Sequence, residues 1–298
     1  MVYLVLTIVE AFLLWIGGMN VFDAICHSFT STATGGFSTK QNSIAYWDSA
    51  FIEYVITIFT LLAAINYSLY FLIFKGKPWQ WLKDVETRCF LMSVGIVTAI
   101  ITMALYFMKG YGLELAFRRA FFQVVTLHTS CGYSTDDYTL WPPFTIILII
   151  YIMFAGGCTG STAGGAKSMR LLIILQNVKN EFNRLMHPRA VLPVKVNGHS
   201  VSSSTISTVT TFAMLYIICT VVGWFVFMVF GLQMTEALGI AVSSIGNSGP
   251  GFGSFGPAYS WNALPDAAKW VSSFLMLIGR LELFGILLMF APSFWEKR

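Results

Sequence analysis

Six apolar segments run through this chain, and each is long enough to cross the hydrocarbon core of a bilayer. They cover residues 2–18, 51–74, 89–108, 142–177, 205–230 and 270–291. A membrane-spanning helix needs about 20 such residues. Only 11% of the residues are charged, against about 25% in a soluble domain. We therefore predict an all-α polytopic membrane protein, which excludes a soluble enzyme, a disulfide-stapled secreted domain and a disordered chain.

The fourth apolar segment carries an unusual interruption. Residues 156–167, here called the interrupting loop, are mostly Gly, Ser, Thr and Ala, and apolar residues flank them on both sides. Small and polar residues in such a run disfavour a helix. Irregular backbone at membrane depth is tolerated only where it is buried in protein or lines a water-filled cavity. We expect the interrupting loop to lie beside such a cavity.

Three shorter apolar stretches each precede a Gly-rich turn. The stretches at 19–31, 113–128 and 235–245 are too short to cross a bilayer, which predicts re-entrant helices. The turns that follow, here called the three Gly turns, cover residues 32–39, 129–135 and 246–253. The order of span, short helix, Gly turn and span occurs three times, with Gly35, Gly132 and Gly249 as the equivalent glycines. The chain is thus divided into pore repeats at 1–75, 76–200 and 201–298.

An extended turn after a re-entrant helix can present a column of carbonyl oxygens that replace the hydration shell of K⁺ or Na⁺. Glycine permits the dihedral angles that aim these carbonyls at one axis, and the helix C-termini add partial negative charge there. We therefore predict a selectivity filter for a monovalent cation, K⁺ or Na⁺, and no cofactor. Its candidate residues are Thr32, Ala33, Thr34, Gly35, Thr129, Ser130, Cys131, Gly132, Gly246, Asn247, Ser248 and Gly249.

The basic residues are distributed unevenly between the two predicted sides of the membrane. Eleven Lys and Arg residues lie within 75–88, 170–195 and 297–298, and five lie in segments on the other side. The positive-inside rule then predicts cytoplasmic N- and C-termini, with the Gly turns opening from the outer face. Because the basic residues flank the membrane rather than forming one basic surface, the expected surroundings are membrane lipid, and no nucleic-acid partner is expected.

Two other interpretations of the Gly motifs remain. A single Gly turn in a membrane protein usually reflects close helix packing, and the spacing of Gly156, Gly160 and Gly164 fits that pattern. The sequence Gly246-Asn-Ser248-Gly249 also resembles the way in which an intramembrane serine protease presents its nucleophile. Such a protease needs a basic partner for the serine, usually His. Three Gly turns in equivalent places favour an ion filter over both of these interpretations. We therefore do not expect an enzyme.

Taken together, these motifs resemble the Trk/Ktr/HKT superfamily of potassium transporters, and specifically its bacterial TrkH branch. The resemblance rests on residues 32–39, 156–170, 246–253 and 279–282, and on the ending 291–295. It implies membrane–pore-loop–membrane units around a pseudo-fourfold ion path, and potassium uptake across the bacterial inner membrane. It also implies a homodimer that binds a cytosolic TrkA-like nucleotide-binding regulatory ring.

In this superfamily, the interrupted helix forms an intramembrane gate below the filter, and a basic residue of the last helix faces that gate. The resemblance implies that the gate is formed by Gly156, Gly157, Gly160, Ser161, Thr162, Gly164, Gly165, Lys167 and Arg280. Arg280 and Glu282 both fall inside the sixth apolar segment, where a charge is costly and so points to function. The sequence departs from the family in one respect: three of the expected four repeats are present. We therefore expect a truncated chain that lacks the first repeat.

Overall fold

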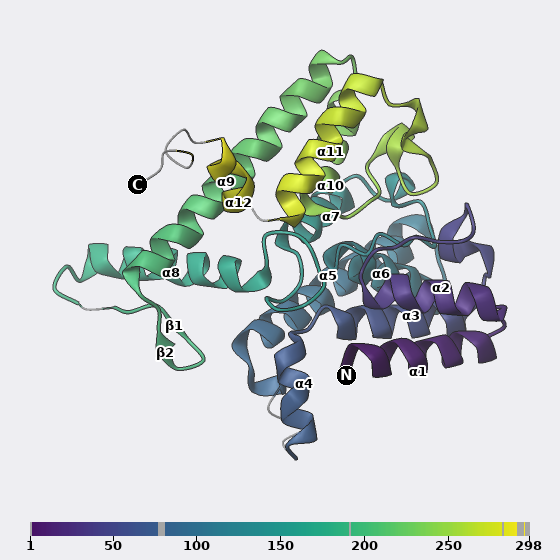
Figure 1. Cartoon of the computed structure of the whole chain (residues 1–298), viewed down its shortest axis with the longest axis horizontal. Helices are drawn as coiled ribbons and strands as arrows, with labels where there is room; N and C mark the ends of the chain where they lie inside the picture. Colours follow the sequence, from purple (N-terminus) through teal and green to yellow (C-terminus); the bar gives the residue numbers. More distant parts are fainter. Residues whose placement is uncertain (1, 77–80, 191, 282, 291–294, 296–298) are drawn as a thin grey trace.

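The computed structural model describes residues 2–76, 81–190, 192–281, 283–290 and 295. Nearly all of its regular structure is helical (Figure 1). The helices are α1 (Val2–Ile16), α2 (Val21–Thr32), α3 (Ala50–Ala63), α4 (Tyr67–Phe74), α5 (Val85–Lys109), α6 (Leu113–His128), α7 (Phe144–Ala155), α8 (Ser168–Met186), α9 (Ser203–Val229), α10 (Met234–Gly246), α11 (Asp266–Arg280) and α12 (Leu283–Met289). Strands β1 (Lys195–Val196) and β2 (His199–Ser200) form one antiparallel hairpin between α8 and α9.

Three helix triplets repeat the same arrangement. In each, a short helix (α2, α6 or α10) packs between the two helices that precede and follow it in the chain. The triplets are α1–α2–α3, α5–α6–α7 and α9–α10–α11 (Figure 1). The re-entrant helices predicted from sequence are therefore present, and their ends agree with the prediction to within two residues.

Two of the described helices, α5 and α9, are long and apolar enough to cross a bilayer by themselves. Three of the six apolar segments are not single helices, and the interruption was predicted for only one of them. The segment 142–177 divides into α7 and α8 around the interrupting loop, as its composition predicts. The segment 51–74 also breaks, between α3 and α4. The segment 270–291 ends its first helix at Arg280, and Glu282 lies outside the described residues.

The break between α3 and α4 has a tertiary cause. The Ala64 carbonyl accepts a hydrogen bond of 3.0 Å from the Cys158 backbone N–H, and the Tyr67 N–H donates to the Gly160 carbonyl over 3.2 Å. Both bonds tie the chain to the interrupting loop rather than to the next helical turn. The loop therefore satisfies the backbone groups that the broken helix leaves open.

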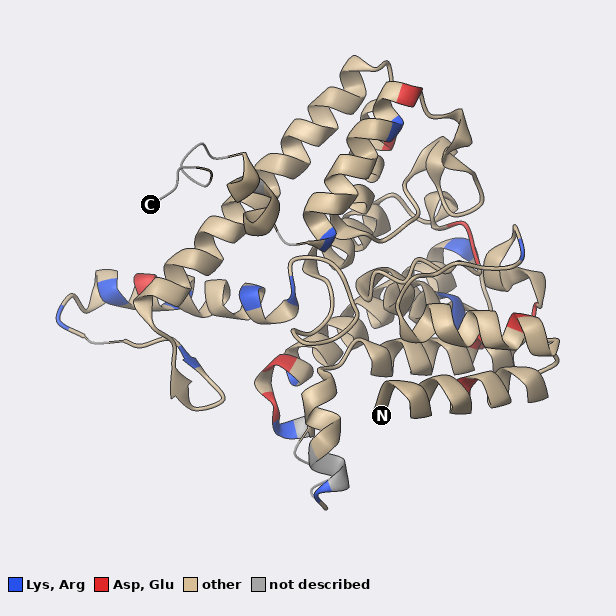
Figure 2. Cartoon of the chain, in the orientation of Figure 1, with Lys and Arg blue, Asp and Glu red and all other residues tan. Residues whose placement is uncertain are grey.

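The molecular surface is consistent with a lipid environment. Helices α7 and α9 carry no charged residue, and the charges gather near helix ends and connections (Figure 2). On α9, Met214, Ile217, Val221 and Phe225 lie on one face at helical spacing, and each is at least half exposed. Large apolar patches of this kind are rare on soluble monomers and mark a surface that another apolar phase covers.

Candidate functional site: the Gly turns and the interrupting loop

The three Gly turns share one backbone conformation. In each turn a left-handed residue (Thr34, Ser130 or Asn247) is followed two positions later by a left-handed glycine. These glycines are Gly36, Gly132 and Gly249, with φ of 67°, 83° and 94°. The hydrogen bonds agree, because the N–H groups of Gly36 and Gly132 donate to equivalent carbonyls, those of Thr30 and Thr126.

This geometry corrects the register of the first turn by one residue. The sequence alignment placed Gly35 opposite Gly132, but Gly35 lacks the left-handed conformation and corresponds to Cys131. The sequence contains a signal for this register, because Gly36-Phe-Ser-Thr39 parallels Gly132-Tyr-Ser-Thr135, whereas anchoring on Gly35 loses that match. The residue equivalent to Gly132 and Gly249 is therefore Gly36.

Close approach of the turns explains why these positions are glycine. A Cβ on Gly36 would lie 1.7 Å from the Cys131 carbonyl oxygen, and a Cβ on Gly132 would lie 2.2 Å from that of Ser248. Both distances are far inside van der Waals contact, so only glycine fits without moving a neighbouring turn. The turns thus lie backbone against backbone, in the order first, second, third. All three line a cavity of 770 Å³.

Oxygen atoms and partial negative charge gather at the three turns, and Lys40 and Arg280 also line the cavity. The C-terminal ends of α2, α6 and α10 run into the three turns, and a helix C-terminus carries partial negative charge. The Ser130 and Ser248 hydroxyl oxygens are buried and have no hydrogen-bond partner among the described residues. A group of His, Cys, Asp and Glu that could hold a resident metal is absent from the described part of the chain. Backbone and hydroxyl oxygens are therefore the ligands that the turns offer.

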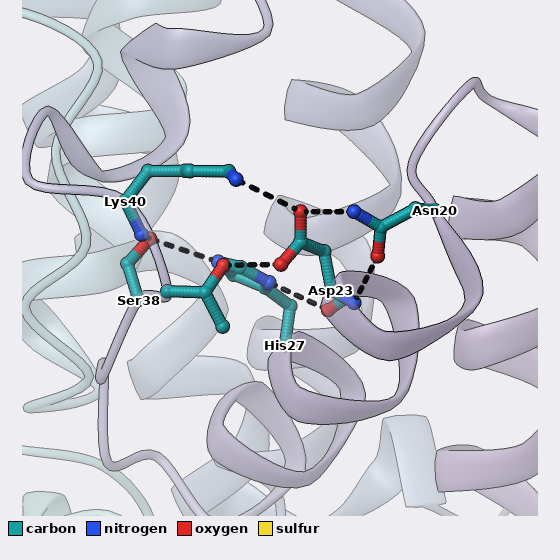
Figure 3. Close-up of polar contacts among 6 residues, drawn as sticks. Asn20, Asp23, His27, Ser38 and Lys40 are labelled. Carbon is teal, nitrogen blue, oxygen red and sulfur yellow. Dashed lines mark hydrogen bonds and ion pairs between the residues drawn. The ribbon is translucent and has the colours of Figure 1, made fainter.

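Figure 3 shows a polar cluster that fixes the chain on either side of the first turn. The Asp23 carboxylate belongs to the N-terminal end of α2. It accepts a hydrogen bond of 2.6 Å from the Thr39 hydroxyl and pairs with Lys40 Nζ at 3.4 Å. His27 donates from Nδ1 to the Asp23 carbonyl and accepts at Nε2 from the Ser38 hydroxyl. This tautomer is assigned from its partners, because the carbonyl can only accept.

The ionisation of this cluster follows from its contacts. The Thr39 hydroxyl bond, helped by the nearby Lys40 ammonium, lowers the pKa of Asp23 below its ordinary value. Burial lowers the pKa of His27, which keeps the imidazole neutral at pH 7. Asp23 is therefore a carboxylate and Lys40 its counter-ion at physiological pH, and α2 has an anion near its positively polarised N-terminus.

A related contact occurs in the other two units, and in the second unit the two charges are exchanged. Thirteen residues before the left-handed glycines stand Asp23, Arg119 and Glu236. Arg119 pairs with Asp136 at 2.8 Å, the reverse of the Asp23–Lys40 pair, since Lys40 and Asp136 each follow their glycine by four residues. Glu236 accepts a hydrogen bond of 3.1 Å from the Ser254 N–H. Each turn is thus connected to its own short helix, near the helix start in the first and third units and one turn further along in the second.

The interrupting loop lies against all three Gly turns. The Thr162 carbonyl accepts the Thr34 hydroxyl at 2.9 Å, and the Thr162 hydroxyl donates to the Thr32 carbonyl at 3.1 Å. A Cβ on Gly164 would lie 2.7 Å from the Gly246 carbonyl oxygen and 3.1 Å from Ser130 Oγ. The loop therefore contacts the first, second and third turns within three of its own residues.

A second cavity, of 400 Å³, lies on the other side of the loop. Its lining includes Ser161, Thr162, Gly164, Gly165 and Lys167, whereas the Gly turns line only the first cavity. Arg280 lines both cavities and donates to the Thr162 carbonyl over 3.1 Å. It does so from the C-terminal end of α11, not from the middle of a continuous span as the sequence predicted. The loop and Arg280 thus separate the two cavities.

The backbone of the interrupting loop depends on its small residues. Gly156, Gly160, Gly165 and Lys167 are all left-handed, which ends any helical continuation from α7. A Cβ on Gly156 would lie 2.3 Å from the Gly164 carbonyl oxygen, so the two arms of the loop touch. Gly157 packs as closely, since its Cβ would lie 2.5 Å from that of Ala163. The Lys167 ammonium donates to the Ala163 carbonyl within the loop.

Sequence reasoning missed two buried carboxyl groups at this site. Glu10 of α1 is fully buried and accepts hydrogen bonds from the Ser31 and Thr32 hydroxyls, directly behind the first turn. Glu86 of α5 contacts the interrupting loop. The signal for Glu10 was present, because an acidic residue inside an apolar segment is costly and marks function. Glu86 lies just before its apolar segment, where a charged residue is ordinary.

The geometry does not support the serine protease alternative. Ser248 Oγ has no hydrogen-bond partner, whereas His27 Nε2 is paired with Ser38 and His128 Nε2 with Ser93. A nucleophilic serine needs a base within hydrogen-bond reach. Neither buried histidine supplies one to Ser248 in the described structure.

Re-entrant helices, converging Gly turns and a loop that separates two cavities define a pore-loop membrane protein. Residues 1–297 match the family model described as TrkH, cation transport protein. The chain belongs to the TrkH family, which confirms the family and the fold predicted from the sequence.

Relatives in this family are similar over the whole chain. The Trk system potassium uptake protein TrkH of Escherichia coli K12 is 36% identical over all of this chain and 62% of its own length. TrkG of the same strain is 36% identical over 95% of this chain and 58% of its own length. The crystal structure of the potassium transporter TrkH from Vibrio parahaemolyticus superimposes with a TM-score of 0.93 at 36% identity, over 99% of this chain and 64% of that one. The chain thus spans about six tenths of the length of these relatives.

Proposed function

We propose that this chain contributes a K⁺-selective path for potassium uptake across the bacterial cytoplasmic membrane. The three Gly turns act as its filter, with Thr34, Gly36, Ser130, Gly132, Asn247 and Gly249 as backbone ligands, and Ser130 and Ser248 hydroxyls nearby. The observation that carries the proposal is the shared left-handed geometry of three converging turns. The relatives named as Trk system potassium uptake proteins support K⁺ as the transported ion.

The interrupting loop acts as the gate of this path. Two observations support this role: the position of the loop between the two cavities and its contacts with all three turns. Arg280 adds a positive charge at the same constriction, which opposes the passage of a cation.

The remaining proposals rest on the family resemblance and on the distribution of charge. The chain works as a homodimer, and a cytosolic TrkA-like nucleotide-binding ring controls its gate. Its termini face the cytoplasm, because eleven basic residues lie on that side and five on the other. Co-purification of the chain with the ring, and cross-linking of two copies in the membrane, test these assignments.

Potassium influx tests the function directly. The protein that contains this chain, expressed from its complete reading frame in a bacterium that lacks its own K⁺ uptake systems, is expected to deplete K⁺ from a low-K⁺ medium. A Gly95→Ala variant is the matched control, because a Cβ at Gly95 of α5 meets no atom within 4 Å. Membrane-inserted chain without K⁺ influx would refute the proposal, and peptide hydrolysis lost in Ser248→Ala would establish the protease alternative instead.

A further inference from the structure

The interrupting loop is held at both ends by one carboxyl group. Glu86, in the first turn of α5, is 2% exposed. Its Oε1 accepts a hydrogen bond of 2.6 Å from the Thr159 backbone N–H and one of 3.0 Å from the Met169 N–H. Thr159 lies in the first arm of the loop and Met169 lies just past the second, in the first turn of α8. The two arms therefore meet at a single oxygen atom.

We infer that Glu86 is the positioning residue of the interrupting loop, fixing its two arms so that Thr162 and Gly164 stay against the Gly turns. Nine residues lie between the two whose N–H groups it binds, and the loop between them contains several left-handed positions. Such a backbone has few internal hydrogen bonds to define its shape. An anchor at both ends of the loop limits the conformations that it can adopt. The positioning role of Glu86 does not depend on the proposed function. Only the description of the loop as a gate rests on it.

The anchor itself is built on a rigid base. Asp84 caps α5 by accepting from the Thr87 N–H over 2.8 Å. Asn197, at the tip of the β1–β2 hairpin, donates to Asp84 Oδ1 over 2.7 Å and accepts from the Val85 N–H over 3.0 Å. The first turn of α5 is thus held from both sides, and Glu86 projects from it to the loop. The Glu86 carboxyl group, although it belongs to α5, lies beside the first turn of α8. The positive polarisation of that helix N-terminus favours an acidic group there.

Cys158 reports the position of the loop without any measurement of transport. It precedes Thr159 and is fully buried, whereas Cys131 in the second Gly turn is 3% exposed and serves as an internal control for folding. The experiment measures the rate of maleimide labelling at each cysteine by mass spectrometry, in the membrane-embedded chain. The variants are Glu86→Leu, Glu86→Gln and Glu86→Asp. The control is Glu181→Leu, which removes an exposed carboxyl group of α8.

We expect Glu86→Leu to raise the labelling rate of Cys158 by about tenfold or more while Cys131 stays protected, because two buried N–H groups lose their acceptor. Glu86→Gln should stay within about threefold of the parent, since the amide oxygen can accept both bonds. Glu181→Leu should change neither rate. Protection of Cys158 in Glu86→Leu would overturn the inference.

Two further outcomes are distinguishable. If Glu86→Leu exposes both cysteines, the milder Glu86→Asp variant decides: a rise at Cys158 alone supports the anchor, and protection of Cys158 refutes it. The same variants are also assayed for K⁺ flux in vesicles. Labelling of Cys158 that rises while flux stays at the parent level would leave Glu86 as the positioning residue and would remove the loop from the gate.

Discussion

Exchanging the two adjacent glycines of the first turn for alanine separates the register seen in the structure from the register predicted by sequence. At Gly36 an added Cβ meets the Cys131 carbonyl oxygen at 1.7 Å, and φ is 67°. At Gly35 the nearest atoms lie at 3.5 Å or beyond and belong to the Phe37 side chain and to the Thr30 carbonyl in α2. Gly36→Ala should therefore disrupt the turn, and Gly35→Ala should be tolerated.

The size of the effect follows from two contributions. A left-handed non-glycine residue costs about 1–2 kcal/mol. The carbon–oxygen contact must also open by more than ~1 Å to escape overlap, so the first and second turns have to move apart. A shift of that size exceeds the differences in cavity radius that a snug filter could use to distinguish K⁺ from Na⁺. We expect Gly36→Ala to lose most of its K⁺ selectivity, by about tenfold or more.

The assay compares initial rates of K⁺ and Na⁺ uptake in cells or vesicles that contain equal amounts of each variant. Gly95→Ala, with open space around its Cβ, controls for the substitution of glycine itself. Unchanged selectivity in Gly36→Ala, or a loss in Gly35→Ala with Gly36→Ala unaffected, would refute the register and the role given to the first turn.

Three further perturbations test other parts of the site. Gly132→Ser brings a Cβ to 2.2 Å from the Ser248 carbonyl, so K⁺ uptake relative to Na⁺ should fall, and an unchanged ratio would remove Gly132 from the filter. Arg280→Ala should raise basal K⁺ flux severalfold in reconstituted vesicles, because it removes a positive charge that contacts the loop; flux at the parent level would contradict this. Asp23→Lys should lower thermal stability and K⁺ selectivity by placing two cations together, and the double exchange with Lys40→Asp should restore part of both, since the second unit carries the reversed pair. Failure of the double variant to improve on the single one would show that the pair does not position the turn. The contribution of Asp23 depends on pH in a defined direction: its pKa is lowered by the Thr39 hydroxyl, so the stability that it adds is present above about pH 4 and is lost as the pH falls through the lower, folded-state pKa.

Much of this fold follows from hydropathy and glycine content. The three re-entrant helices and the interrupting loop were predictable because short apolar stretches and a Gly-rich run each leave a clear pattern at membrane depth. The break of the second apolar segment was not. Its one local signal is Asn66, which accepts a hydrogen bond of 2.8 Å from the Ser68 N–H at the start of α4, and the other bonds at the break come from the interrupting loop. A local pattern cannot reveal a boundary that a distant segment imposes.

The candidate site was predictable in outline, and its register could also have been predicted, but its anchors could not. Gly36-Phe-Ser-Thr39 parallels Gly132-Tyr-Ser-Thr135, and the left-handed φ of Gly36 and its packing against Cys131 agree with that match. Glu86 gave no signal, because its importance comes from two backbone N–H groups that lie 73 and 83 residues later in the chain.

Locating the permeant ion tests the central claim most directly. Anomalous scattering from Rb⁺ or Tl⁺, in crystals of the protein with its interrupting loop closed, gives that position. We predict density on the axis between Gly36, Gly132 and Gly249, within reach of the carbonyls of the three turns, and none in the cavity beyond the loop. Density elsewhere, with the turns empty at saturating ion, would contradict both the filter and the gate.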